Sequence, residues 1–118
     1  MGWIVHEAVI VTSFDEKAIN LAHKEALRIF NGYVTELIRS PVNTWWSFLI
    51  PPDGSKEGWD ASHLGDARRD EFRRWVLAQA FEDGSNLLDV VAVAYGELDR
   101  AIITAVDGHE TGADARRR

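Results

Sequence analysis

The order of strand-like and helix-like segments constrains this chain more than any other feature. Segments rich in Ile and Val, typical of strands, alternate with two segments whose apolar residues recur at helical spacing. We expect strands over residues 4–12, 34–38, 44–50, 87–95 and 101–106, and helices over 14–30 and 66–80, with Ser62 as an earlier possible start of the second helix. Right-handed crossovers close this order naturally. The sequence therefore predicts an α+β fold: a ferredoxin-like βαββαβ sandwich with one extra C-terminal strand, and two helices on one face of an antiparallel sheet.

Local signals set the limits of these segments. Ser13 and Glu16 form a capping-box pattern, in which each side chain satisfies a backbone donor of the other at a helix start. The pair Asn31-Gly32 predicts a left-handed stop after the first helix. Two prolines, Pro51 and Pro52, end the third strand, because proline cannot donate to a strand ladder.

The expected sheet is apolar on both faces. Side chains alternate along a strand, so Val9 and Val11 share one face and Ala8 and Ile10 share the other. Two helices cover only one face, and a large exposed apolar patch is unusual on a monomer. We therefore expect a homodimer through the open sheet face; a ligand cavity on that face, or its closure by the loop or the tail, are the alternatives.

Composition narrows the class of protein. The 118 residues fit one domain, which we place at 1–106 with a flexible C-terminal tail at 107–118. A net charge of -6 argues against general nucleic-acid binding, which needs basic surface. The chain has no cysteine, and no apolar run approaches the roughly 20 residues that span a bilayer, so we expect no membrane contact. The opening residues lack the pattern of a secretory signal, which favours the cytoplasm.

Arg68 is the most informative single residue of the sequence. At 3.6 residues per turn it falls on the same stripe as Leu64 and Phe72, with Trp75 and Val76 further along. A guanidinium on a core stripe is costly unless it is paired or wet. Either it clamps a phosphate or carboxylate of a ligand, or it forms a structural ion pair with Glu7 or Asp89, both of which interrupt apolar strands.

The polar loop before this helix holds a second set of candidates. It brings together a cation, Lys56, and an aromatic ring, Trp59, which are the two groups that a nucleotide needs for its phosphate and its base. The candidate ligand-binding residues are Lys56, Trp59, His63, Arg68, Arg69 and Arg73.

Other chemistry is less well supported by the sequence. Asp60, His63 and Asp66 are spaced by three, but they match no known metal-ligand set, and we expect neither a metal nor a cofactor. There is no Ser-His-Asp arrangement with usable context. A small hydrolase or transferase using Glu7, Asp89 and a histidine stays as an alternative.

The segments 51–59, 65–69 and 82–85, together with the opening 6–13, resemble a family of small uncharacterised proteins encoded by bacteriophages and prophages. The resemblance extends to about Tyr95. It implies a phage origin and a function in the cytoplasm of the infected bacterial host, and it carries over no catalytic residues. We therefore expect a non-enzymatic accessory protein that binds a small anionic, nucleotide-like ligand and sequesters a host immune signal. A module that inhibits a host protein through an acidic surface or the sheet face is the alternative.

Overall fold

A computed structural model of the chain describes residues 4–56, 58–96 and 101–107. In chain order the elements are β1 (Val5–Ser13), α1 (Glu16–Ile29), β2 (Ile38–Arg39), β3 (Trp46–Ile50), α2 (Asp60–Ala78), β4 (Asp89–Gly96) and β5 (Ile102–Asp107). The expected tail lies outside the described residues except for Asp107, as does most of the connection before β5.

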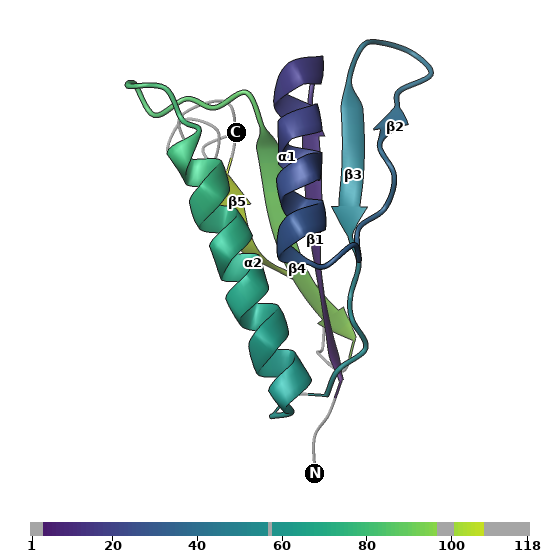
Figure 1. Cartoon of the computed structure of the whole chain (residues 1–118). Helices are drawn as coiled ribbons and strands as arrows, with labels where there is room; N and C mark the ends of the chain where they lie inside the picture. The colour runs from purple at the N-terminus through teal and green to yellow at the C-terminus, as the bar shows by residue number, and fades with distance from the viewer. Residues whose placement is uncertain (1–3, 57, 97–100, 108–118) are drawn as a thin grey trace.

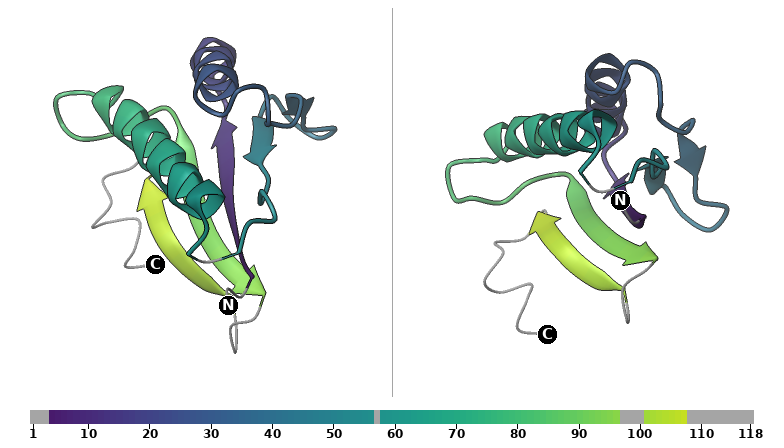
Figure 2. Two further views of the ribbon diagram at one scale, coloured as in Figure 1. Left: turned by 60° about the horizontal axis from the view of Figure 1, so that its bottom comes forward. Right: turned by 90° about the horizontal axis from the view of Figure 1, so that it is seen from below.

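The strands form one antiparallel sheet in the order β2-β3-β1-β4-β5. In its centre, Val9 of β1 lies opposite Ile50 of β3 and Ala92 of β4. Both helices lie on the same face of this sheet, as Figures 1 and 2 show. The predicted α+β class, with two helices and a five-stranded antiparallel sheet, is therefore confirmed.

The core lies between the helices and the face of the sheet that they cover. Phe72 of α2 is fully buried, and its ring meets those of Phe30 and Phe48 edge-on at 6.2 and 6.4 Å between centroids. Around these rings lie apolar side chains from every layer: Val9, Val11, Ile19, Ala22, Ala26, Ile29, Ile50, Val76, Leu88 and Val90. The stripe expected for the first helix is buried as predicted, because regular apolar spacing places one face of a helix on the core.

The start of α1 differs from the prediction. Asp15 is the N-cap, and its carboxylate accepts a hydrogen bond from the Ala18 amide at 2.8 Å. Ser13 is instead a fully buried residue of β1 whose hydroxyl donates to the Leu87 carbonyl at 2.6 Å. The capping box between Ser13 and Glu16 was wrong, because the strand extends to Ser13 and uses that hydroxyl to join the segment before β4. The stop is confirmed: Asn31 and Gly32 both have positive φ, 53° and 88°.

The second strand is also shorter than expected. β2 contains only Ile38 and Arg39, whereas the sequence predicted a strand over 34–38. Thr35 still pairs with Leu49 of β3. Its amide donates to the Leu49 carbonyl at 3.0 Å as in a strand ladder, but the Leu49 amide donates to the Thr35 hydroxyl, at 2.8 Å. A side-chain acceptor in place of a backbone carbonyl interrupts the regular ladder there.

No helix of the described chain covers the other face of the sheet. The register places nine apolar or aromatic side chains on it, which we call the open face: Ala8, Ile10, Ile38, Leu49, Val91, Val93, Tyr95, Ile103 and Val106. Ile10 is 40% and Ile103 65% exposed. The assignment of Val9 and Ile10 to opposite faces is thus confirmed. Among the described residues, neither helix has the length and apolar character needed to cross a membrane.

Candidate functional site

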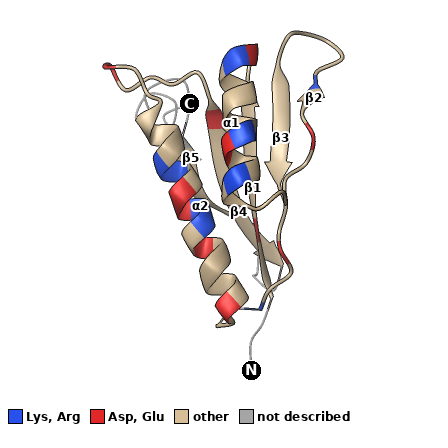
Figure 3. Ribbon diagram, in the orientation of Figure 1, with Lys and Arg blue, Asp and Glu red and all other residues tan. Residues whose placement is uncertain are grey.

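Acidic and basic residues alternate along α2 (Figure 3). The arginine that this helix directs toward the core is not the one that the sequence indicated. The buried line of this helix runs through Ser62, Gly65, Phe72 and Val76, and Arg69 falls on it with its side chain 16% exposed. Leu64, by contrast, is half exposed. The placement of Arg68 on the inward line was therefore wrong by one residue. Small residues occupy the inward positions in the first turns, which lets the helix approach the strands closely.

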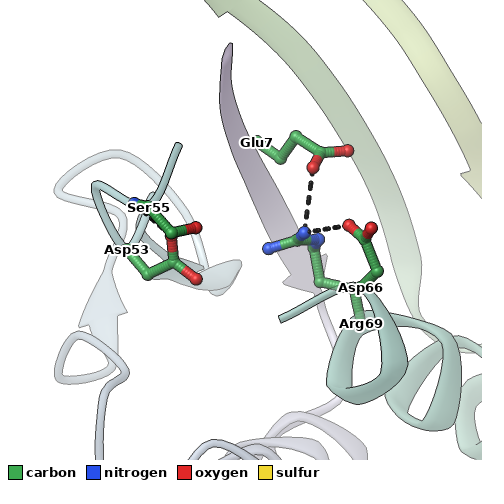
Figure 4. A network of polar contacts seen from close by, with 5 residues as sticks. All are labelled: Glu7, Asp53, Ser55, Asp66 and Arg69. Atoms are coloured by element: carbon green, nitrogen blue, oxygen red, sulfur yellow. Dashed lines mark hydrogen bonds and ion pairs between the residues drawn. The ribbon is translucent and has the colours of Figure 1, made fainter. Parts of the chain in front are cut away.

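Arg69 is held in a network of carboxylates (Figure 4). Its guanidinium donates to Glu7 of β1 at 2.9 Å and to Asp66, one turn earlier on α2, at 2.5 Å. This is the structural ion pair with Glu7 that the sequence analysis offered for Arg68. Since its charge is already compensated, Arg69 joins α2 to the sheet and is not available as a free ligand clamp.

Asp53 lies on another side of Arg69, in the loop after β3 (Figure 4). Its carboxylate accepts two hydrogen bonds from Ser55, from the amide at 2.9 Å and from the hydroxyl at 2.6 Å. Burial acts to raise the pKa of Asp53, but the Ser55 hydrogen bonds and the Arg69 charge outweigh it and hold the pKa below its ordinary value. A β-carbon at Gly65 would lie only 2.7 Å from Asp53 Oδ2, so the absence of a side chain there makes room for this carboxylate.

Arg68 lines a cleft of about 210 Å³ on the flank of α2 that faces α1, which we call the Arg68 cleft. Its walls come from the end of α1 and the turn after it, the end of β3 with the loop beyond, and the first turns of α2. Among the described residues, the Arg68 guanidinium makes no hydrogen bond and no ion pair. The lining residues are mainly apolar or aromatic: Phe30, Tyr33, Ile50, Pro51, Asp53, Ala61, Leu64, Gly65, Arg68 and Arg69.

The other predicted site residues lie elsewhere. Lys56 Nζ is 5.6 Å from the ring centroid of Trp59, which is half exposed and is the N-cap residue of α2 without a side-chain cap bond. His63 is exposed and does not line the cleft. Arg73 lies on the opposite flank of α2, in a hollow beside β4 and β5 that it shares with Glu7 and other charged residues. The structure therefore does not gather the six candidates in one site: Arg68 and Arg69 line the cleft, Lys56 and Trp59 contact each other, His63 is exposed outside the cleft, and Arg73 lines the hollow on the opposite flank.

A metal centre has no support in this arrangement. Within the part of the chain that the structure describes, no three or more carboxylate or histidine side chains gather as metal ligands, and the set Asp60, His63 and Asp66 is no exception.

A groove of about 230 Å³ lies between the first half of α1 and the last half of α2. It is walled by Leu21, Trp75 and Phe81. Of the charged residues described on its rim, Asp15 is engaged in capping α1, and Lys17 is exposed. This groove offers no partly buried charge that lacks a described partner, so we place the candidate site at the Arg68 cleft.

Sequence reasoning missed several residues of this cleft. Asp53 was not singled out within the polar loop, Phe30 was interpreted as the end of the first helix, and Tyr33 was not considered. The chain matches no protein-family model, no curated protein and no solved structure. What the cleft binds is therefore inferred from its own residues.

Proposed function

We propose that this chain is a non-enzymatic binding protein for a small anionic ligand that carries a ring, and that Arg68 meets the anionic group. The observation that carries the proposal is Arg68, a partly buried residue that lines the cleft and whose guanidinium has no partner among the described residues. Holding a cation partly out of water costs free energy unless a partner compensates it, and a carboxylate or phosphate pairs with a guanidinium through two parallel hydrogen bonds. A bound anion would supply that partner.

The walls of the cleft support the ring. Phe30 is buried at its base, and Leu64 exposes half of its surface toward solvent beside it. Burial of an aromatic ring against such side chains is favourable. The volume of the cleft is below the roughly 300–1,000 Å³ typical of sites that enclose a drug-sized ligand, so the cleft would hold one part of such a ligand. A nucleotide would place one part in the cleft and extend the rest along the start of α2, toward Trp59 and Lys56.

A titration tests this proposal. Isothermal calorimetry would measure binding of nucleoside monophosphates, cyclic dinucleotides and aromatic carboxylates to the parent chain and to Arg68→Gln. The matched control is Arg74→Gln, which removes the same charge from an exposed position on the same helix. We expect Arg68→Gln to lose at least tenfold in affinity and the control to lose less than twofold. A parent that binds none of the panel, or an Arg68→Gln chain that binds as the parent does, would contradict the proposal.

The resemblance to phage-encoded proteins gives this binding a biological setting. A chain that holds a small anion without turning it over would sequester a host immune signal in an infected bacterial cell. The competing hypothesis is inhibition of a host protein through the acidic surface or the open face. Ligand binding that survives open-face substitutions but is lost with Arg68→Gln favours sequestration.

We also propose that two copies associate through the open face. Its apolar residues carry no charge, and Asp89, which the register puts on the same face, lies at its border where β4 begins, so two chains of net charge -6 meet there with little repulsion. Five strands about 4.8 Å apart give a footprint on the order of 500 Å², which approaches the roughly 800 Å² that each partner buries in a standard interface. Sedimentation equilibrium should give a dimer for the parent and a monomer for Ile103→Glu. Val42→Glu, at a position 87% exposed in the loop after β2, is the control, and a monomeric parent would refute this association.

For the fold, we propose a ferredoxin-like sandwich extended by β5. The strand order supports this classification. β3 lies between the two strands of the unit β1-α1-β2, and β1 lies between the two strands of the unit β3-α2-β4, so each unit is split by a strand of the other. The two-residue β2 and the added β5 are departures from the simple four-stranded form. An experimental structure with a different neighbour for β1 would exclude this classification.

A further inference from the structure

The Arg68 cleft contains a carboxylate as well as a guanidinium. Asp53 is one of its lining residues, and its Oδ1 accepts both hydrogen bonds from Ser55. Its Oδ2 is directed at α2, close to Gly65. The cleft therefore presents a fixed negative group together with the positive group of Arg68.

These two groups do not neutralise each other. No ion pair joins Arg68 to Asp53 among the described residues, although both line the same small cleft. The cation whose charge helps to lower the pKa of Asp53 is Arg69, and the Arg69 guanidinium also pairs with the carboxylates of Glu7 and Asp66. Asp53 and Arg68 are thus two opposite charges on the wall of one cleft that are not paired with each other. A ligand with several negative charges would place one of them near Asp53, where like charges repel.

We infer that the ligand of the Arg68 cleft is a small zwitterion, namely an α-amino acid with an apolar or aromatic side chain. Its carboxylate pairs with Arg68, its ammonium group donates to Asp53, and its side chain packs against Phe30 and Leu64. This inference rests on the proposed function, in which Arg68 meets the anionic group of a ligand, and adds a positively charged group to the same ligand. An ammonium group beside the carboxylate compensates Asp53, which a simple anion cannot do.

The size of the cleft agrees with a ligand of this class. Its volume of about 210 Å³ is below the roughly 300–1,000 Å³ of sites that enclose a drug-sized ligand, so the cleft suits a molecule of amino-acid size better than a whole nucleotide. The wall formed by Phe30, Ile50 and Leu64 is apolar and suits a side chain without charge.

The chain offers an unusually well matched control for Asp53. Asp83 lies in a second Asp-Gly-Ser turn, and its carboxylate accepts from the Ser85 amide at 2.9 Å and from the Ser85 hydroxyl at 2.6 Å, the same distances as in the Asp53 turn. Asp83 does not line the Arg68 cleft. Asp83→Asn therefore repeats the chemical change of Asp53→Asn in the same local structure, away from the site.

The experiment compares three probes by calorimetry on the parent chain: L-phenylalanine, 3-phenylpropanoate without the amino group, and 2-phenylethylamine without the carboxylate. We expect L-phenylalanine to bind at least tenfold more tightly than either partial ligand. Asp53→Asn should lose at least fivefold for L-phenylalanine and change 3-phenylpropanoate by less than twofold, with Asp83→Asn indistinguishable from the parent for both.

The outcomes separate this inference from the proposed function. If 3-phenylpropanoate or a nucleoside monophosphate binds the parent as tightly as L-phenylalanine, with dependence on Arg68, the zwitterion inference is overturned and the proposed function stands. If none of the probes binds, L-phenylalanine included, both are overturned. The comparison of probes on the parent needs no variant, so it decides the matter even where Asp53→Asn does not fold.

Discussion

The Arg69 guanidinium donates to the Glu7 carboxylate at 2.9 Å, and this bond joins the first half of α2 to the beginning of β1. The two side chains are only 16% and 27% exposed. They lie between the Arg68 cleft on one flank of α2 and the hollow beside Arg73 on the other. The pair therefore fixes the position of the helix that carries the candidate site.

Glu7→Gln should destabilise the fold by about 1–2 kcal/mol. The change removes the charge that compensates a mostly buried guanidinium, and a hydrogen bond to a charged group contributes roughly 1.5–3 kcal/mol, which partial exposure reduces. Glu71→Gln is the control: it removes the Arg28 pair at 3.1 Å, whose side chains are 62% and 48% exposed, and should cost less than about 0.5 kcal/mol. Urea unfolding at neutral pH measures both, and equal costs would show that Glu7 holds nothing in place.

Asp15→Ala should destabilise the chain by about 1 kcal/mol, because it removes the side chain that caps α1. Glu16→Ala should change the free energy of unfolding by less than about 0.5 kcal/mol, since Glu16 only adds a favourable charge to the first turn. Thermal and urea unfolding of the two variants compare them directly. If Glu16→Ala proves the costlier change, the capping box predicted from the sequence describes the molecule better than the Asp15 cap.

The contrast between α1 and α2 explains how far the sequence alone can lead. In α1 the inward residues Ile19, Ala22, Ala26 and Ile29 are all apolar, so their spacing predicts the buried face correctly. In the first turns of α2 the inward residues are small or charged, and hydropathy does not distinguish them from exposed ones. The only large apolar residue in those turns is Leu64, and its prominence shifted the predicted stripe by one residue.

The candidate site depends on contacts that no local pattern contains. Arg68 was singled out for a position on the core stripe that Arg69 occupies. Asp53 enters the cleft because the loop after β3 folds back onto Gly65, twelve residues further along. Periodicity and turn signals are local, so they indicate a polar loop after the third strand and do not show what the Asp53 carboxylate would face.

The pH dependence of stability should reflect the two Asp-Gly-Ser turns. Both aspartates have a pKa below the ordinary value of 3.8. In Asp83 the Ser85 hydrogen bonds lower the pKa, and in Asp53 the pKa is lowered despite the opposing effect of burial. A carboxyl with a lower pKa in the folded chain stabilises the fold above its unfolded pKa, and this contribution is lost as the pH falls through the folded pKa.

The measurement is urea unfolding between pH 3 and 7 of the parent and of a double variant that carries both Asp53→Asn and Asp83→Asn. The parent should be the more stable chain at pH 7, and the difference should shrink as the pH falls below about 4. A difference that stays constant across this range would mean that the two carboxyls titrate alike in the folded and unfolded chains.

Gly65→Ala should separate stability from binding. Alanine is favoured over glycine inside a helix by about 1 kcal/mol, but the new β-carbon would lie 2.7 Å from Asp53 Oδ2 and 3.2 Å from Arg69 Nη1. Both side chains would have to move, which offsets the gain in helix propensity. We therefore expect a change in the free energy of unfolding of less than about 1 kcal/mol, together with a loss of at least fivefold in binding of L-phenylalanine.

Ala67→Gly, at an exposed position of the same helix, calibrates the propensity term. It should destabilise the chain by about 1 kcal/mol, and the amount by which Gly65→Ala falls short of the opposite gain measures the contact with Asp53 and Arg69. Should Gly65→Ala stabilise the chain by the full amount and bind L-phenylalanine as the parent does, then Asp53 is not held against α2, and it has no part in the Arg68 cleft.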